Sequence, residues 1–105
     1  MIRIVEYVTP EGKNHFAEWF AKIPAKHAVR VSEALHRMAL GNLGDHKGVG
    51  DGVIERRIFG SPALRLYYGL EGQALVILLA GGTKHKQAKD IAKAKALWVA
   101  YKKET

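Results

Sequence analysis

VIERRIF (residues 53–59), ALRLYYGL (63–70) and QALVILLA (73–80) are three consecutive runs rich in β-branched, aromatic and aliphatic residues. Such runs indicate strands. Gly60-Ser61-Pro62 and Glu71-Gly72 connect them, and links this short favour antiparallel hairpins. The third run is apolar at successive positions, so we expect it to be the central strand of the sheet, covered on both faces.

Helical periodicity precedes and follows these runs. Thr9-Pro10-Glu11 has the composition of a helix start, and an apolar face follows at Phe16, Trp19, Phe20 and Ile23. Pro24 separates this helix from a second one, which Gly41-Asn42 ends. A third helical pattern covers about residues 86–103.

The remaining segments complete the order of elements. Residues 2–8 alternate apolar and charged side chains, which indicates a first strand, and residues 41–52 contain five glycines, which favours a loop. We therefore predict one domain, residues 1–105, with the order β-α-α-β-β-β-α. The fold class is α+β: a small, mainly antiparallel sheet with the two N-terminal helices on one face and a C-terminal helix.

Composition excludes several kinds of protein. The 105 residues include no cysteine, and no helix carries the paired histidines of a metal site, so we expect neither metal nor cofactor. The longest apolar run, residues 74–81, is far shorter than the roughly 20 residues of a membrane span. The first residues are too charged for a signal peptide. We expect a soluble, cytoplasmic protein with no membrane partner.

The positive charge is concentrated in the second half of the chain. Residues 53–105 hold ten Lys/Arg and four Asp/Glu, whereas residues 1–52 hold seven and six, so +6 of the net charge of +7 lies in the second half. Such an asymmetry indicates a polyanionic partner.

Strand parity groups the charged residues on one face. Glu55, Arg57, Arg65 and Tyr67 alternate with apolar residues and should share the face opposite the helices, with Lys84 just beyond the third run. On an open face this set suits RNA, because guanidinium groups bind phosphate and an aromatic ring stacks an unpaired base. Cleavage by the 2′-hydroxyl of RNA needs a base, an acid and cations, without a metal.

At these residues the chain resembles the RelE/HigB/ParE toxins of bacterial toxin–antitoxin modules, especially the phage-related addiction-module killer proteins. The similar segments, in chain order, are Phe16-Ala17-Glu18-Trp19, Gly41-Asn42-Leu43-Gly44-Asp45, Glu55-Arg56-Arg57-Ile58, Arg65-Leu66-Tyr67-Tyr68 and residues 81–91. The resemblance implies an α+β fold with helices on one side of an antiparallel sheet. It also implies growth arrest by ribosome-dependent cleavage of mRNA.

The resemblance and the parity together give the candidate site residues. The catalytic candidates are Arg57, Arg65, Lys84 and Glu55, and the RNA-binding candidates are Tyr67, His85, Lys86 and Gln87. Two positions depart from RelE-like members, which have a basic residue at the position of Glu55 and a tyrosine near that of Asp90. Glu55 could orient the arginines or take a proton. Parity directs Arg56 toward the helices, so we expect its side chain to reach outward at a sheet edge.

Two alternatives remain open on the same fold. ParE-like relatives poison DNA gyrase without cutting RNA, and a basic RNA-binding module without toxicity is a third reading. Both toxin readings predict a cognate antitoxin, of helix-turn-helix type and encoded by an adjacent gene, in a toxin–antitoxin hetero-oligomer. The nuclease reading adds the ribosome and mRNA as partners.

Overall fold

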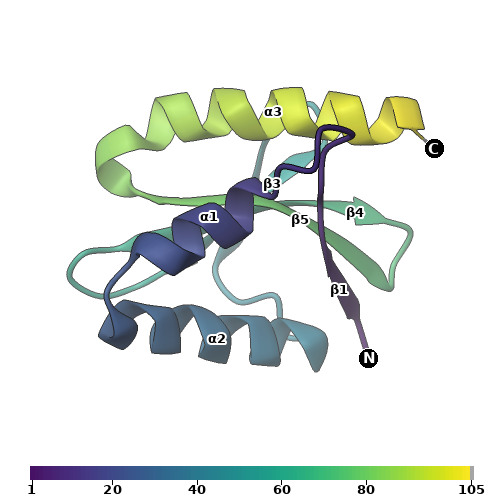
Figure 1. The fold of residues 1–105 in the computed structure, drawn as a ribbon. Helices are drawn as coiled ribbons and strands as arrows, with labels where there is room; N and C mark the ends of the chain where they lie inside the picture. Colours follow the sequence, from purple (N-terminus) through teal and green to yellow (C-terminus); the bar gives the residue numbers. More distant parts are fainter. Residues whose placement is uncertain (105) are drawn as a thin grey trace.

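Five strands form one sheet in the order β1-β5-β4-β3-β2 in a computed structural model, which describes residues 1–104 (Figure 1). Neighbouring strands pair antiparallel, except that β1 runs parallel to β5. The fold is therefore α+β with a mixed sheet. The elements in chain order are β1 Arg3–Glu6, α1 His15–Lys22, α2 Ala25–Ala39, β2 His46–Gly50, β3 Val53–Ile58, β4 Leu64–Glu71, β5 Leu75–Thr83, a short 3₁₀ turn η1 Lys84–Lys86, and α3 Gln87–Glu104.

Helices cover both faces of the sheet. In Figure 1, α1 and α2 lie on one side and α3 crosses the other. Two apolar cores result: one contains Val31 and Met38 of α2, and the other contains Leu97 and Trp98 of α3. The expectation that the helices lie on one side, leaving the second face open, is wrong. The apolar stripe of α3 explains why, because Ala94, Leu97 and Trp98 are buried against that face.

The three runs that were expected to pair as hairpins do so. β3 pairs with β4 and β4 with β5, all antiparallel. The central strand is β4 rather than β5, because β1 and β2 add one strand to each side. The apolar sequence of β5 is nevertheless explained by burial, since seven consecutive residues from Val76 to Gly82 are buried.

The first helix begins later than its sequence suggested. Asn14 is the N-cap of α1, and its side-chain oxygen accepts a hydrogen bond from the Ala17 N–H at 2.9 Å. Thr9 caps a turn instead, since its hydroxyl oxygen accepts from the Lys13 N–H at 3.0 Å. The end of α2 agrees with the prediction: Gly41 has φ of 101°, the left-handed conformation that commonly ends a helix.

The segment predicted to be a loop, residues 41–52, contains the edge strand β2. Its partner is β3, with His46 opposite Arg56 and Lys47 opposite Glu55. Asp51 and Gly52 both have positive φ, 58° and 86°, and form the tight turn between the strands. An Asp-Gly pair is a strong hairpin signal, which the high glycine content of the segment obscured.

No helix within residues 1–104 has the length and apolar character needed to cross a membrane.

Candidate functional site

The register of the sheet brings two arginines together at one end of one face, and a lysine follows just beyond the strand. Arg57 lies directly opposite Arg65, and Arg65 lies opposite Gly82. Lys84 follows Gly82 by two residues, at the start of η1. Side chains on directly opposite residues have Cβ atoms about 4.5–5.5 Å apart. We refer to Arg57, Arg65 and Lys84 as the cation row.

A β-bulge makes this alignment possible. The pairing of β4 with β5 shifts between Tyr67, which faces Ala80, and Tyr68, which faces Leu78. Leu79 is therefore the extra residue, and both Leu79 and Ala80 pack in the core beneath α3. The shift places Gly82 on the α3 side of the sheet, next to Arg65. Parity along β5 alone could not reveal this.

Glu55 is the centre of a buried polar network beside the cation row. Its Oε2 accepts hydrogen bonds from the Tyr67 hydroxyl at 3.2 Å and the Gln87 amide at 2.8 Å. The Nε of Arg65 lies 3.5 Å from the same oxygen. Burial, followed by the charge and hydrogen bond of Glu55, raises the pKa of Tyr67 above its usual range, so its phenol stays protonated and donates.

The prediction that these residues stand on an open face is wrong for three of them. Glu55 and Tyr67 are 0% exposed and Arg65 is 6% exposed. Gln87, in the first turn of α3, closes over Glu55 through their hydrogen bond. In this conformation Tyr67 has no free face on which a base could stack. Glu55 accepts hydrogen bonds from Tyr67 and Gln87. The Nε and Nη1 of Arg65 are buried and have no hydrogen-bond partner within residues 1–104.

The other candidates are accessible. The Arg57 side chain is 37% exposed, and its Nε lies 3.1 Å from Oδ2 of Asp45. Lys84, His85 and Lys86 are exposed in η1. The structure therefore divides the predicted site into a sealed part, around Glu55, and an exposed part, around η1.

Arg56 is buried rather than extended outward as predicted. Its Nη1 donates to the carbonyl of Leu43 at 3.0 Å, so the segment before β2 covers the guanidinium group. Burial lowers the pKa of Arg56. Gly44, with φ of 64°, lies so close to this group that a Cβ there would overlap it.

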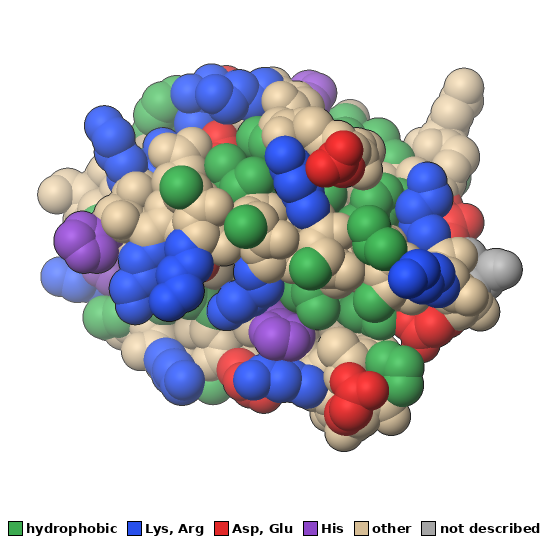
Figure 2. All heavy atoms as spheres, turned by 90° about the horizontal axis from the view of Figure 1, so that it is seen from above, with side chains coloured by type: hydrophobic (Ala, Val, Ile, Leu, Met, Phe, Trp, Pro, Cys, Tyr) green, Lys and Arg blue, Asp and Glu red, His purple; other side chains and the backbone are tan. Residues whose placement is uncertain are grey.

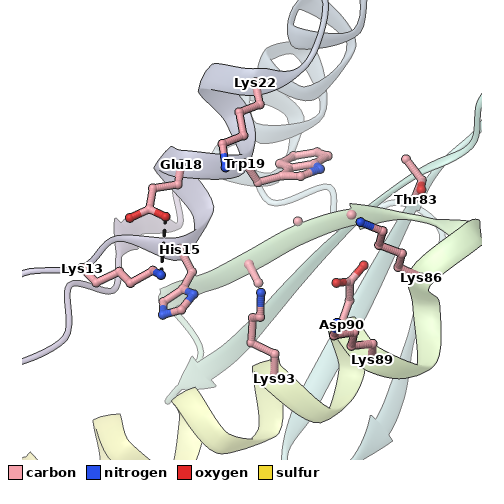
Figure 3. Close-up of a pocket in the computed structure, with 13 residues that line it drawn as sticks. Lys13, His15, Glu18, Trp19, Lys22, Thr83, Lys86, Lys89, Asp90 and Lys93 are labelled. Carbon is pink, nitrogen blue, oxygen red and sulfur yellow. Dashed lines mark ion pairs between the residues drawn. The ribbon is translucent and has the colours of Figure 1, made fainter.

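A groove that the sequence did not reveal lies on the other side of the η1 turn. It has a volume of about 430 Å³ and lies between α1 and the start of α3 (Figure 3). Residues 80–83 of β5 line it, beyond the part of β5 that pairs with β1. The side chains that line it are Lys13, His15, Glu18, Trp19, Lys22, Thr83, Lys86, Lys89, Asp90 and Lys93. We call this the lysine groove.

The lysine groove unites residues from distant parts of the chain. Lys13, Lys22 and Trp19 come from α1 and the turn before it, whereas Lys86 and Lys93 come from η1 and α3. Read alone, the lysines of α3 suggest an ordinary solvated face. The ring of Trp19 occupies the space that a side chain at Gly81 would fill, and this contact packs α1 against β5. Because of that packing, the lysines of α3 face a second set of lysines on α1 and the turn before it.

Two titratable groups in the lysine groove have shifted pKa values. Burial lowers the pKa of His15, and the nearby charges of Lys13 and Lys93 lower it further. Burial raises the pKa of Asp90, with Lys93, Lys86 and Lys89 opposing that shift. Asp90 is packed against β5, where a Cβ at Gly82 would overlap its carboxylate.

No group of three or more potential metal ligands occurs among the side chains of residues 1–104.

The chain is 40% identical over 83 residues to an uncharacterized protein of Haemophilus influenzae. The matched region covers 78% of this chain and 84% of the Haemophilus protein. The two proteins belong to one family. No family model matches the chain. The shared family extends over most of both proteins.

Proposed function

We propose that this protein is the toxin of a toxin–antitoxin module and arrests growth by ribosome-dependent cleavage of mRNA. The observation that carries the proposal is the register that sets Arg57 opposite Arg65, at the end of the sheet where β5 leads into Lys84. The ordered resemblance to RelE-like killer proteins supports the same activity. The proposed partners are the ribosome, mRNA and a neutralising antitoxin.

The exposed cations are the proposed phosphate ligands. Arg57 and Lys84 reach solvent, so they can meet the scissile phosphate and stabilise the charge that develops on it. Arg65 lies between them in the register and is held by Glu55. We assign the Glu55–Arg65 pair the role of positioning the row, because both side chains are buried. His85, exposed beside Lys84, is the proposed proton-transfer group.

One observation favours a second candidate function. Glu55, Arg65 and Tyr67 are sealed beneath the start of α3, and a gyrase poison of the ParE kind needs no accessible catalytic centre. The two functions share the fold, so the fold cannot distinguish them. They are distinguished in expressing cells, where a nuclease breaks mRNA and a gyrase poison induces the DNA-damage response.

The test uses an exposed member of the row. Lys84→Ala should reduce mRNA cleavage by roughly 10²–10³-fold, by analogy with the loss of one oxyanion-hole donor. Primer extension on a reporter mRNA, minutes after expression, measures the breaks. Lys47→Ala, an exposed lysine on β2, is the matched control and should cut like the wild type.

Arg65→Ala is a poor test by itself. Removing one partner of a buried ion pair costs about 3–5 kcal/mol of stability, so loss of activity could reflect unfolding.

Intact reporter mRNA with induction of the DNA-damage response would instead support gyrase poisoning. Wild-type cleavage by both Lys84→Ala and Arg57→Ala would exclude the cation row as the phosphate site.

A further inference from the structure

We propose that the lysine groove binds the sugar–phosphate backbone of single-stranded RNA next to the cation row. The inference deepens the proposed function, on which the choice of RNA as the occupant rests. It assigns the path of the substrate strand and adds residues of α1 to the site.

The first support is the convergence of charge from two walls. Lys13 and Lys22 stand on the α1 wall, and Lys86, Lys89 and Lys93 on the η1–α3 wall. Figure 3 shows the side chains of both walls around the space between α1 and α3. Glu18 forms an ion pair with Lys13 at 3.7 Å. None of the other four lysines forms an ion pair within residues 1–104.

The second support is that lysines from both walls of the groove affect the pKa of one side chain, His15. Burial lowers the pKa of His15, and Lys13, before α1, and Lys93, on α3, both lower it further. The positive potential is therefore shared across the groove and does not belong to one helix surface. Seen from the α3 side in Figure 2, Lys and Arg side chains gather over the end of the molecule where α3 begins.

The third support is continuity with the cation row. Gly82 lines the groove and lies directly opposite Arg65 in the sheet. The η1 turn begins at Lys84, a member of the row, and ends at Lys86, which lines the groove. Cations therefore follow one another around the start of α3, and a polyanion with one charge on every residue fits such a track.

The aromatic lining favours a polynucleotide over an acidic peptide. Trp19 lines the groove and is half-buried, with its ring against Gly81. An indole beside a phosphate track can stack an unpaired base, which an acidic peptide would not supply. The other tryptophan, Trp98, is buried in the core beneath α3.

The experiment measures binding of a fluorescein-labelled 2′-O-methyl oligouridylate, which cannot be cleaved because its 2′-hydroxyl is blocked. The groove variant is Lys86→Gln/Lys89→Gln/Lys93→Gln, and the control is Lys26→Gln/Lys47→Gln/Lys103→Gln. All six lysines are exposed, and both variants lose the same charge. Circular dichroism confirms that each variant folds.

The groove variant should bind about tenfold or more weakly than the control. The slope of the logarithm of its binding constant against the logarithm of the salt concentration should also become shallower, by about 0.7 for each lysine that contacts a phosphate. The oligonucleotide should quench Trp19 fluorescence, and Trp19→Phe should remove that quenching. Equal weakening by the control variant, or none by the groove variant, would overturn the proposal.

Two further outcomes keep this inference distinct from the proposed function. Polyglutamate of equal length that binds as tightly, with the same lysine dependence, would assign the groove to an acidic peptide and overturn the RNA proposal. Lysine-dependent binding of the oligonucleotide, together with intact mRNA in expressing cells, would refute the nuclease function and leave the RNA groove standing.

Discussion

The pKa of Asp90 is set by two effects that act in opposite directions, burial and the charges of nearby lysines. Its carboxylate is packed against β5 at Gly82, and burial raises its pKa while three lysines oppose the rise. The net direction is upward from 3.8, so burial outweighs the lysine charges. Ionised Asp90 therefore lowers the stability of the fold at neutral pH.

Replacing Asp90 with Asn should raise the melting temperature at pH 7 by a few degrees. A carboxyl group whose pKa is raised on folding binds its proton more tightly in the native state, so its penalty is absent below 3.8 and grows as pH rises through the folded pKa. Thermal unfolding at pH 3 and pH 7 measures the gain, which should vanish at pH 3. A gain of equal size at both values would rule out ionisation as its source.

At the residue scale, the sequence predicted which face of the sheet each side chain lies on, but not how deeply that side chain is buried. Parity correctly placed Glu55, Arg57, Arg65 and Tyr67 on one face of the sheet. It did not give their partners across the strands, which the register of β3 and β4 sets as Arg57 opposite Arg65 and Glu55 opposite Tyr67. It could not show that α3 covers Glu55 and Tyr67, because that depends on how a distant helix packs. The bulge at Leu79 and the covering of Arg56 by residues near Leu43 are likewise tertiary effects.

At the element scale, α3 is held to the sheet by a close approach to β4. Trp98 of α3 packs over Gly69, which is buried between Val53 and Ile77 in neighbouring strands. A Cβ at Gly69 would overlap the indole ring. Gly69 is thus a position where the lack of a side chain allows a helix to approach the sheet.

Gly69→Ala should destabilise the protein by about 1–3 kcal/mol, the usual cost of inserting volume into a packed core. The ring cannot move freely, because it also stacks on Tyr101 with centroids 5.3 Å apart. Urea unfolding measures the loss. Gly48→Ala on β2 is the control, since a Cβ there meets nothing within 4 Å. Equal losses in the two variants would mean that strand glycines, and not the Trp98 contact, set the cost.

The elements themselves were largely predictable. Four of the five strands and all three helices follow from the sequence pattern, because each has an apolar face or an apolar run. The missed strand, His46–Gly50, has an exposed edge and two glycines, so it lacks the apolar alternation that marks a strand. The parallel pairing of β1 with β5 brings together residues about 70 positions apart, which no local pattern encodes.

At the scale of the whole molecule, the two helical layers share one sheet. Leu66 and Leu78 face the α1–α2 core, whereas Tyr67 and Leu79 in the same strands face the α3 core. Tyr7, after β1, also donates a hydrogen bond to Glu104 near the end of α3, and burial together with that contact raises its pKa to about 12. The layers should therefore unfold together.

The two tryptophans test this cooperativity, because Trp19 lies on the α1 side and Trp98 on the α3 side. In Trp98→Phe, fluorescence reports α1, and in Trp19→Phe it reports α3. Each fluorescence transition in urea should coincide with the far-ultraviolet circular dichroism of the same variant, as expected for two-state unfolding. Loss of the Trp98 signal at lower urea than the circular dichroism would show that α3 separates first. The start of α3 could then open over Glu55 and Tyr67, and the sealed part of the site would become accessible without global unfolding.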